Sequence, residues 1–185
     1  MTDVQANAQR RSRFAQIPSF MSALRLPIAI VFFAVDNVLW RGILLFLGAL
    51  TDLLDGWLAR KFGVESKTGA LLDPLFDKLF VTIALAAFLP GPYLTWTGFL
   101  VLVSRDLYVG FGYLLSRLLK VVVEVKARPT GKLVTVLQIV TLFVLLLAPE
   151  RVGLFLVAVG AASVLAIIDY TAAGVAELRA RAKAA

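Results

Sequence analysis

Residues 51–78 read TDLLDGWLARKFGVESKTGALLDPLFDK, and they place four aspartates inside a chain that is otherwise strongly apolar. Of the 185 residues, 60% are hydrophobic and 17% are charged, and the mean hydropathy is +0.87. A soluble domain is only about 45–50% apolar and needs more polar surface than this composition supplies. The sequence therefore predicts an integral membrane protein, in which a group of four acids needs an explanation.

Six apolar segments predict an all-α membrane protein with six transmembrane helices. Their residue runs lack the strict alternation of a membrane barrel, and a helix satisfies its own backbone hydrogen bonds in lipid. Pro90-Gly91-Pro92 and Ala148-Pro149-Glu150 mark two tight connections between segments. The expected helices cover about 22–36, 38–59, 69–89, 94–118, 131–148 and 152–172.

Lysine and arginine gather on one side of this six-helix map. They lie in the N-terminal segment, after the second helix, around the connection 117–132 and at the C-terminal end, whereas Arg41 and Arg151 fall on the opposite side. By the positive-inside rule, both termini face the cytoplasm. The net charge of +7 is thus explained by topology, and we expect no nucleic-acid partner. The expected location is the inner (cytoplasmic) membrane of a prokaryote, as a multi-pass protein whose active site faces the cytoplasm.

The ends of the chain are expected to lie outside the bilayer. Residues 1–20 are basic, with phenylalanines and an isoleucine between the arginines, which suits a short interfacial helix on the anionic leaflet or a disordered basic tail. Residues 21–174 are expected to form a single six-helix domain. Residues 175–185 are expected to be a basic cytoplasmic tail.

The four aspartates are arranged as two pairs with helical spacing. Asp52 and Asp55 are three residues apart and Asp73 and Asp77 are four apart, so each pair lies on one helix face. Clustered carboxylates near a membrane repel one another and resist ionisation unless a divalent cation is present. The chain has no cysteine and no histidine, so a metal must be held by oxygen ligands. This donor chemistry favours Mg²⁺ or Mn²⁺, as one ion or two.

Small residues and a guanidinium accompany the acids. Gly56, Ala59 and Gly69 leave room beside them for helix packing or for a ligand, and Arg60 offers a fork-shaped cation for phosphate. Any one acid could be an interfacial cap, and the glycines could be ordinary packing positions. The whole set is too costly near a membrane to persist without a role, and it describes a site for a diphosphate.

The spacing Asp52-x-x-Asp55-Gly56-x-x-Ala59-Arg60, eight residues, then Gly69-x-x-x-Asp73-x-x-x-Asp77 resembles the full signature of the CDP-alcohol phosphotransferases. Two further stretches, IPSFMSALRLP and GKLVTVLQ, are similar to the family's first and fifth helices. The resemblance implies a six-helix, homodimeric membrane enzyme. It transfers a substituted phosphate from a CDP-linked donor to an alcohol and releases CMP.

The resemblance also implies roles for the matching positions. Asp52, Asp55 and Asp73 would ligate two metal ions together with the donor diphosphate. Asp77 would complete the metal site and act as the general base, or would be a fourth ligand without a proton role. The donor's cytidine and phosphates would be bordered by Gly56, Ala59, Arg60 and Gly69.

The acceptor alcohol is less clearly encoded. Candidate binding residues are Arg105, Lys126, Arg128 and Lys132, although positive-inside charge and snorkelling also explain such cations. The chain resembles the branch that makes glycerol-based anionic lipids. SRDLYVGFGYLL carries Asp106 and Tyr113 where phosphatidylglycerophosphate synthases typically have glutamate and arginine. These two differences favour phosphatidylglycerol as the acceptor, as in cardiolipin synthases, with CDP-diacylglycerol as the donor. Glycerol 3-phosphate is the alternative, and an inositol phosphate is less favoured.

Two other classes of protein use acids within membrane helices. Intramembrane prenyltransferases also bind a diphosphate through Mg²⁺, but they usually carry two separate aspartate-rich motifs on a longer chain. A divalent-cation transporter would not need Gly56, Ala59, Arg60 and Gly69 at these offsets. Metal-dependent release of CMP from CDP-diacylglycerol would distinguish the phosphatidyltransferase from both.

Overall fold

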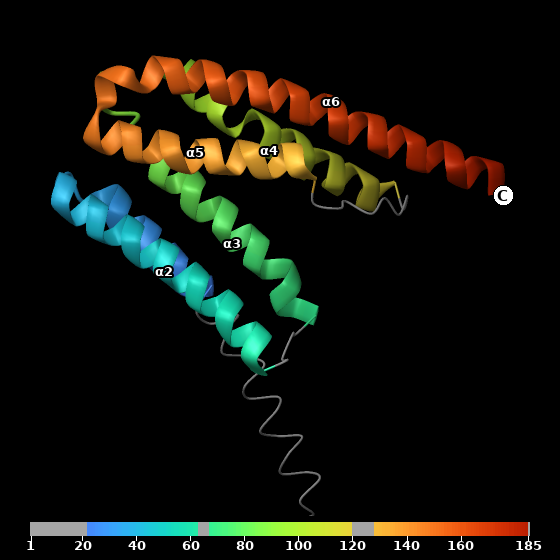
Figure 1. Cartoon of the computed structure of the whole chain (residues 1–185), viewed down its shortest axis with the longest axis horizontal. Helices are drawn as coiled ribbons and strands as arrows, with labels where there is room; N and C mark the ends of the chain where they lie inside the picture. The colour runs from blue at the N-terminus through green and yellow to red at the C-terminus, as the bar shows by residue number, and fades with distance from the viewer. Residues whose placement is uncertain (1–21, 63–66, 120–127, 185) are drawn as a thin grey trace, which may run out of the picture. The chain divides into compact units, whose positions relative to one another are not determined.

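The computed structural model describes residues 22–62, 67–119 and 128–184, and these ranges are helical apart from short connections (Figure 1). Every apolar segment expected from the sequence coincides with a helix, and no strand occurs in the described ranges. The predicted interfacial segment 1–20 lies outside them. In chain order the helices are Ser22–Ala34, α2 (Val38–Phe62), α3 (Lys67–Ala86), α4 (Trp96–Leu118), α5 (Pro129–Leu147), the short 3-10 helix η1 (Pro149–Arg151) and α6 (Val152–Ala184).

Three helices of the described ranges are long and apolar enough to cross a membrane, namely α4, α5 and the stretch Pro149–Arg179. The chain is therefore a multi-pass membrane protein. The apolar parts Ser22–Ala34 and Val38–Thr51 are shorter, and the second ends where the charged 51–78 stretch begins. The count of six crossings and the cytoplasmic position of both termini stay predictions.

Helix α6 is longer than the sequence analysis expected. The apolar pattern predicts an end near residue 172, whereas the helix continues to Ala184 and takes in most of the expected tail. After Gly174 the sequence VAELRARAKA consists mostly of strong helix formers and contains no proline. Hydropathy marks where a helix leaves the apolar region, and it does not mark where the helix ends.

The chain divides into two compact units, Met1–Ala87 and Phe88–Ala185. In the described part of the first unit, the helix Ser22–Ala34 runs beside α2, with α3 next to them (Figure 1). Gly48 of α2 lies against the ring of Phe80 of α3, so a Cβ at Gly48 would be 2.5 Å from Cζ of that ring. Close packing of α2 on α3 thus depends on a glycine one turn before the aspartate motif.

Arg41 closes the end of the first unit that is remote from the aspartates. Its side chain donates to the carbonyl oxygens of Val35 (2.8 Å) and Ala87 (3.3 Å) and pairs with Asp36 (3.2 Å). The guanidinium also lies over the ring of Phe32, 5.5 Å from its centroid. The Arg41 cation is therefore neutralised and links the start of α2 to the end of the first unit.

The second unit is built from α4, α5 and α6. The long α6 runs along both α4 and α5 (Figure 1). Apolar side chains such as Leu102, Val134, Leu142 and Val159 are fully or almost fully buried between the helices. Thr95 caps the start of α4, since its Oγ1 accepts a hydrogen bond from the backbone N–H of Gly98 at 3.1 Å.

Candidate functional site

The aspartates of the 51–78 stretch lie on two helices, as predicted. Asp52 and Asp55 belong to α2, and Asp73 and Asp77 to α3, so each pair has the expected one-turn spacing. Gly56, Ala59 and Arg60 also lie in α2, and Gly69 lies in α3. Of the four acids, only the Asp77 side chain is among those the structure describes, and how the other three face one another stays a prediction.

Asp77 is paired with an arginine that the sequence analysis did not assign to the site. Arg25, on the helix Ser22–Ala34, forms an ion pair with Asp77 and donates a hydrogen bond from Nε to Thr51 Oγ1 at 3.3 Å. The Arg25 side chain is 3% exposed and that of Asp77 is 44% exposed. Arg25 thus joins three helices next to Asp52. Its signal in the sequence is an arginine within an apolar segment, which needs a partner.

The donor set suits a hard divalent cation. All candidate ligands are carboxylates on α2 and α3, and oxygen ligands are those that Mg²⁺ and Mn²⁺ prefer. The described side chains include no group of three or more potential metal ligands. Three of the four aspartate side chains lie outside the described set. The residues present therefore fit the implied metal by their chemistry.

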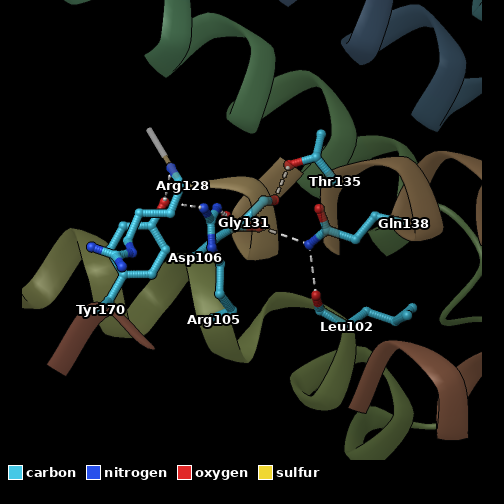
Figure 2. Close-up of polar contacts among 8 residues, drawn as sticks. All are labelled: Leu102, Arg105, Asp106, Arg128, Gly131, Thr135, Gln138 and Tyr170. Carbon is cyan, nitrogen blue, oxygen red and sulfur yellow. Dashed lines mark hydrogen bonds and ion pairs between the residues drawn. The ribbon is translucent and has the colours of Figure 1, made fainter. Parts of the chain in front are cut away.

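The second unit holds Arg105, which the sequence analysis named as a candidate acceptor ligand. Its side chain is 9% exposed. Nη1 contacts Asp106 Oδ1 at 2.7 Å, and Nη2 donates to the hydroxyl of Tyr170 at 2.9 Å. The guanidinium also lies over the Tyr170 ring, 5.1 Å from the centroid. Arg105 is thus held between its neighbour on α4 and an aromatic residue of α6 (Figure 2).

Two residues of α5 complete the surroundings of Arg105. Gln138 Nε2 donates to Asp106 Oδ2 and to the carbonyl oxygen of Leu102, both at 2.7 Å (Figure 2). Gly131 lies where a Cβ would overlap Arg105 Nη2 and come within 2.6 Å of the Tyr170 hydroxyl. The guanidinium therefore rests directly against the backbone of the first turn of α5.

Arg128 precedes α5 and is tied to α6. Its Nε and Nη2 contact the two carboxylate oxygens of Asp169 at 2.7 and 2.6 Å, and Thr130 Oγ1 donates to the same carboxylate at 2.7 Å. The hydrogen bond with Asp169 raises the pKa of the Arg128 guanidinium above its ordinary value. The backbone N–H of Arg128 also lies 3.4 Å from the Tyr170 hydroxyl. Tyr170 therefore connects Arg105 with the start of α5.

The other two candidate acceptor ligands differ from these. Lys132 is exposed, and within the part of the chain that the structure describes its side chain forms no ion pair or hydrogen bond. Lys126 lies outside the described residues. The structure thus brings Arg105 and Arg128 together at the first turn of α5, with Lys132 on the same turn. Asp169 and Tyr170 were not predicted from the sequence, although an acid near the end of an apolar segment is itself a signal for a paired cation.

Comparisons with known proteins identify the family of the chain. The family model for CDP-alcohol phosphatidyltransferase matches residues 11–170. Similar proteins include the CDP-diacylglycerol--glycerol-3-phosphate 3-phosphatidyltransferases of Rickettsia typhi and Pectobacterium atrosepticum. The first is 31% identical over 144 residues, covering 75% of this chain and 80% of the relative. The second is 31% identical over 148 residues, covering 76% and 75%. The chain therefore belongs to the CDP-alcohol phosphatidyltransferase family, and it is a transferase.

Proposed function

We propose that this protein transfers the phosphatidyl group of CDP-diacylglycerol to glycerol 3-phosphate, with release of CMP. The family supplies the reaction class. The names of the relatives from Rickettsia typhi and Pectobacterium atrosepticum give glycerol 3-phosphate as the acceptor of those enzymes. The run Ser104-Arg105-Asp106 favours phosphatidylglycerol as the acceptor, whereas the relatives favour the alternative, glycerol 3-phosphate.

The observation that carries the choice of acceptor is the polar cluster at the first turn of α5. The first backbone N–H groups of a helix lack intrahelical partners and carry the positive end of its dipole. Arg105 adds a buried guanidinium against Gly131, and Lys132 adds an exposed cation on the same turn. Such a site favours a phosphate monoester, which approaches two negative charges, over the single charge of the phosphatidylglycerol diester.

The aspartates serve the donor half of the proposed reaction. Asp52, Asp55, Asp73 and Asp77 would hold Mg²⁺ or Mn²⁺ together with the donor diphosphate, and the metal would neutralise charge on the leaving CMP. Arg60 would contact the donor phosphates, and Gly56, Ala59 and Gly69 would leave space for the nucleotide. This arrangement keeps the two charged substrates on separate sets of residues.

Asp77 would take the proton of the acceptor hydroxyl as its oxygen attacks the phosphorus of the phosphatidyl group. The bond from that phosphorus to the oxygen of CMP breaks in the same displacement, and CMP leaves. Arg25, which is paired with Asp77, would orient the carboxylate that accepts this proton. The reaction would take place at the cytoplasmic face, in a homodimer.

The test is an acceptor comparison with purified protein. CDP-diacylglycerol is incubated with Mg²⁺ or Mn²⁺ and, separately, glycerol 3-phosphate, phosphatidylglycerol or inositol 1-phosphate, and lipid products and CMP are measured. We expect phosphatidylglycerol phosphate and CMP from glycerol 3-phosphate. Cardiolipin formation from phosphatidylglycerol, without turnover of glycerol 3-phosphate, would refute the proposed acceptor. Asp77→Asn should abolish turnover and retain donor binding, and near-normal turnover by this variant would remove Asp77 from the base role.

A further inference from the structure

Arg105 is paired with the residue that follows it on the same helix, and this pairing is unusual in its geometry. Side chains one residue apart on a helix do not face each other. The contact of 2.7 Å between Arg105 Nη1 and Asp106 Oδ1 therefore needs a second partner that holds the carboxylate in place. Figure 2 shows that this partner comes from α5.

Gln138 holds the Asp106 carboxylate. Its side chain is buried, with the residue 1% exposed, and Nε2 donates to both Asp106 Oδ2 and the Leu102 carbonyl oxygen at 2.7 Å. Both hydrogens of the amide nitrogen are used, and a flipped amide would direct its oxygen at two acceptors. The orientation of Gln138 is therefore fixed, and it directs Asp106 Oδ1 toward Arg105.

The guanidinium held in this way retains unused donors. An arginine carries five N–H donors, and the described contacts of Arg105 engage one on Nη1 and one on Nη2. Nε is buried and has no hydrogen-bond partner among the described residues. A buried donor without a partner is costly, so this oriented guanidinium retains hydrogen-bonding capacity for an anion that binds beside it.

We propose that Gln138 is a positioning residue for acceptor binding, and that it orients Arg105 through Asp106. Because Gly131 has no side chain, it leaves the space that the Arg105 guanidinium occupies. The inference depends on the proposed function, because it takes the acceptor phosphate as the anion. Gln138 does not need to touch the acceptor. Its effect passes through two side chains, and Gly131 acts on the same guanidinium by a different physical route, namely the absence of a Cβ.

The experiment is a double-mutant cycle read as separate KM values for the two substrates. Gln138→Leu, Arg105→Ala and the double variant are compared with wild type under varied glycerol 3-phosphate and varied CDP-diacylglycerol. A lost charge-assisted contact predicts a rise in KM for the acceptor of about tenfold or more in Gln138→Leu, with KM for the donor unchanged. In the double variant the acceptor KM should equal that of Arg105→Ala alone, because Gln138 acts only through Arg105.

Gly131→Ala should give the same selective rise in acceptor KM, and it supplies the test if Gln138→Leu does not fold. Thr141→Val, a buried change about one turn further along α5, serves as a matched control for packing and should leave the acceptor KM near wild type. Additive effects in the cycle, or equal changes in both KM values, would overturn the inference. If wild type uses phosphatidylglycerol instead, the proposed function fails, and the same cycle is read with phosphatidylglycerol as the varied acceptor.

Discussion

Replacing Arg25 with methionine tests whether the Arg25–Asp77 pair supports the fold of the first unit. Methionine keeps an unbranched apolar chain and removes the charge. Breaking a fully buried ion pair costs roughly 3–5 kcal/mol and an exposed pair about 0–1 kcal/mol. Because Arg25 is 3% exposed and Asp77 is 44% exposed, water can solvate the carboxylate that remains. We therefore expect Arg25→Met to lower the free energy of unfolding by about 2 kcal/mol.

The assay is unfolding in detergent micelles of wild type, Arg25→Met, Asp77→Asn and the double variant. If the two side chains stabilise each other, the double variant loses less stability than the sum of the single variants, with a coupling of roughly 1–2 kcal/mol. Arg151→Met is the matched control, because Arg151 is 78% exposed and lies 3.9 Å from Glu150. Additive losses, or a loss no larger than that of Arg151→Met, would show that the pair has no stabilising role.

Three further predictions concern the metal, the acceptor and the end of the first unit. Chelation with EDTA should abolish CMP release, and Mg²⁺ or Mn²⁺ should restore it; full activity in EDTA would contradict the metal role of the aspartates. Lys132→Ala should raise KM for glycerol 3-phosphate about threefold to tenfold at low salt, whereas Arg151→Ala should leave this KM unchanged. Equal effects of the two variants would indicate that only the overall surface charge matters, and would contradict a specific role for Lys132. Arg41→Ala should lower the free energy of unfolding by about 2 kcal/mol, measured by denaturant titration, because two backbone carbonyl oxygens lose their donor.

The helices could be predicted from the sequence because lipid requires long apolar runs, and each run produced one helix. The ends were less predictable. Hydropathy places the end of the last helix near residue 172, but helix propensity carries α6 to Ala184. The aspartate motif was readable because helical spacing fixes which positions share a face. Its placement on α2 and α3 is confirmed, whereas the metal ligation stays a prediction.

The partners of the cations could not be predicted in the same way. Arg25 meets Asp77 and Thr51, and Arg128 meets Asp169, across helices that are far apart in sequence. No local pattern specifies such pairs, because they depend on how helices pack. Gly131 is a similar case, since a glycine in an apolar helix gives no sign that a guanidinium will rest against it.

These pairings change how the basic residues near the proposed acceptor site should be weighed. Counting lysines and arginines around α5 suggests a strongly cationic pocket, but Arg105 and Arg128 each contact an aspartate at 2.6–2.7 Å. Their charges are largely compensated, so their contribution is oriented N–H donors. Lys132 alone among the described candidates has no ion-pair partner within the residues that the structure describes. Electrostatic attraction of the acceptor should then depend mainly on Lys132. Discrimination between the acceptor and other anions should depend on the orientation of Arg105. Salt should therefore weaken the contribution of Lys132 more than that of Arg105.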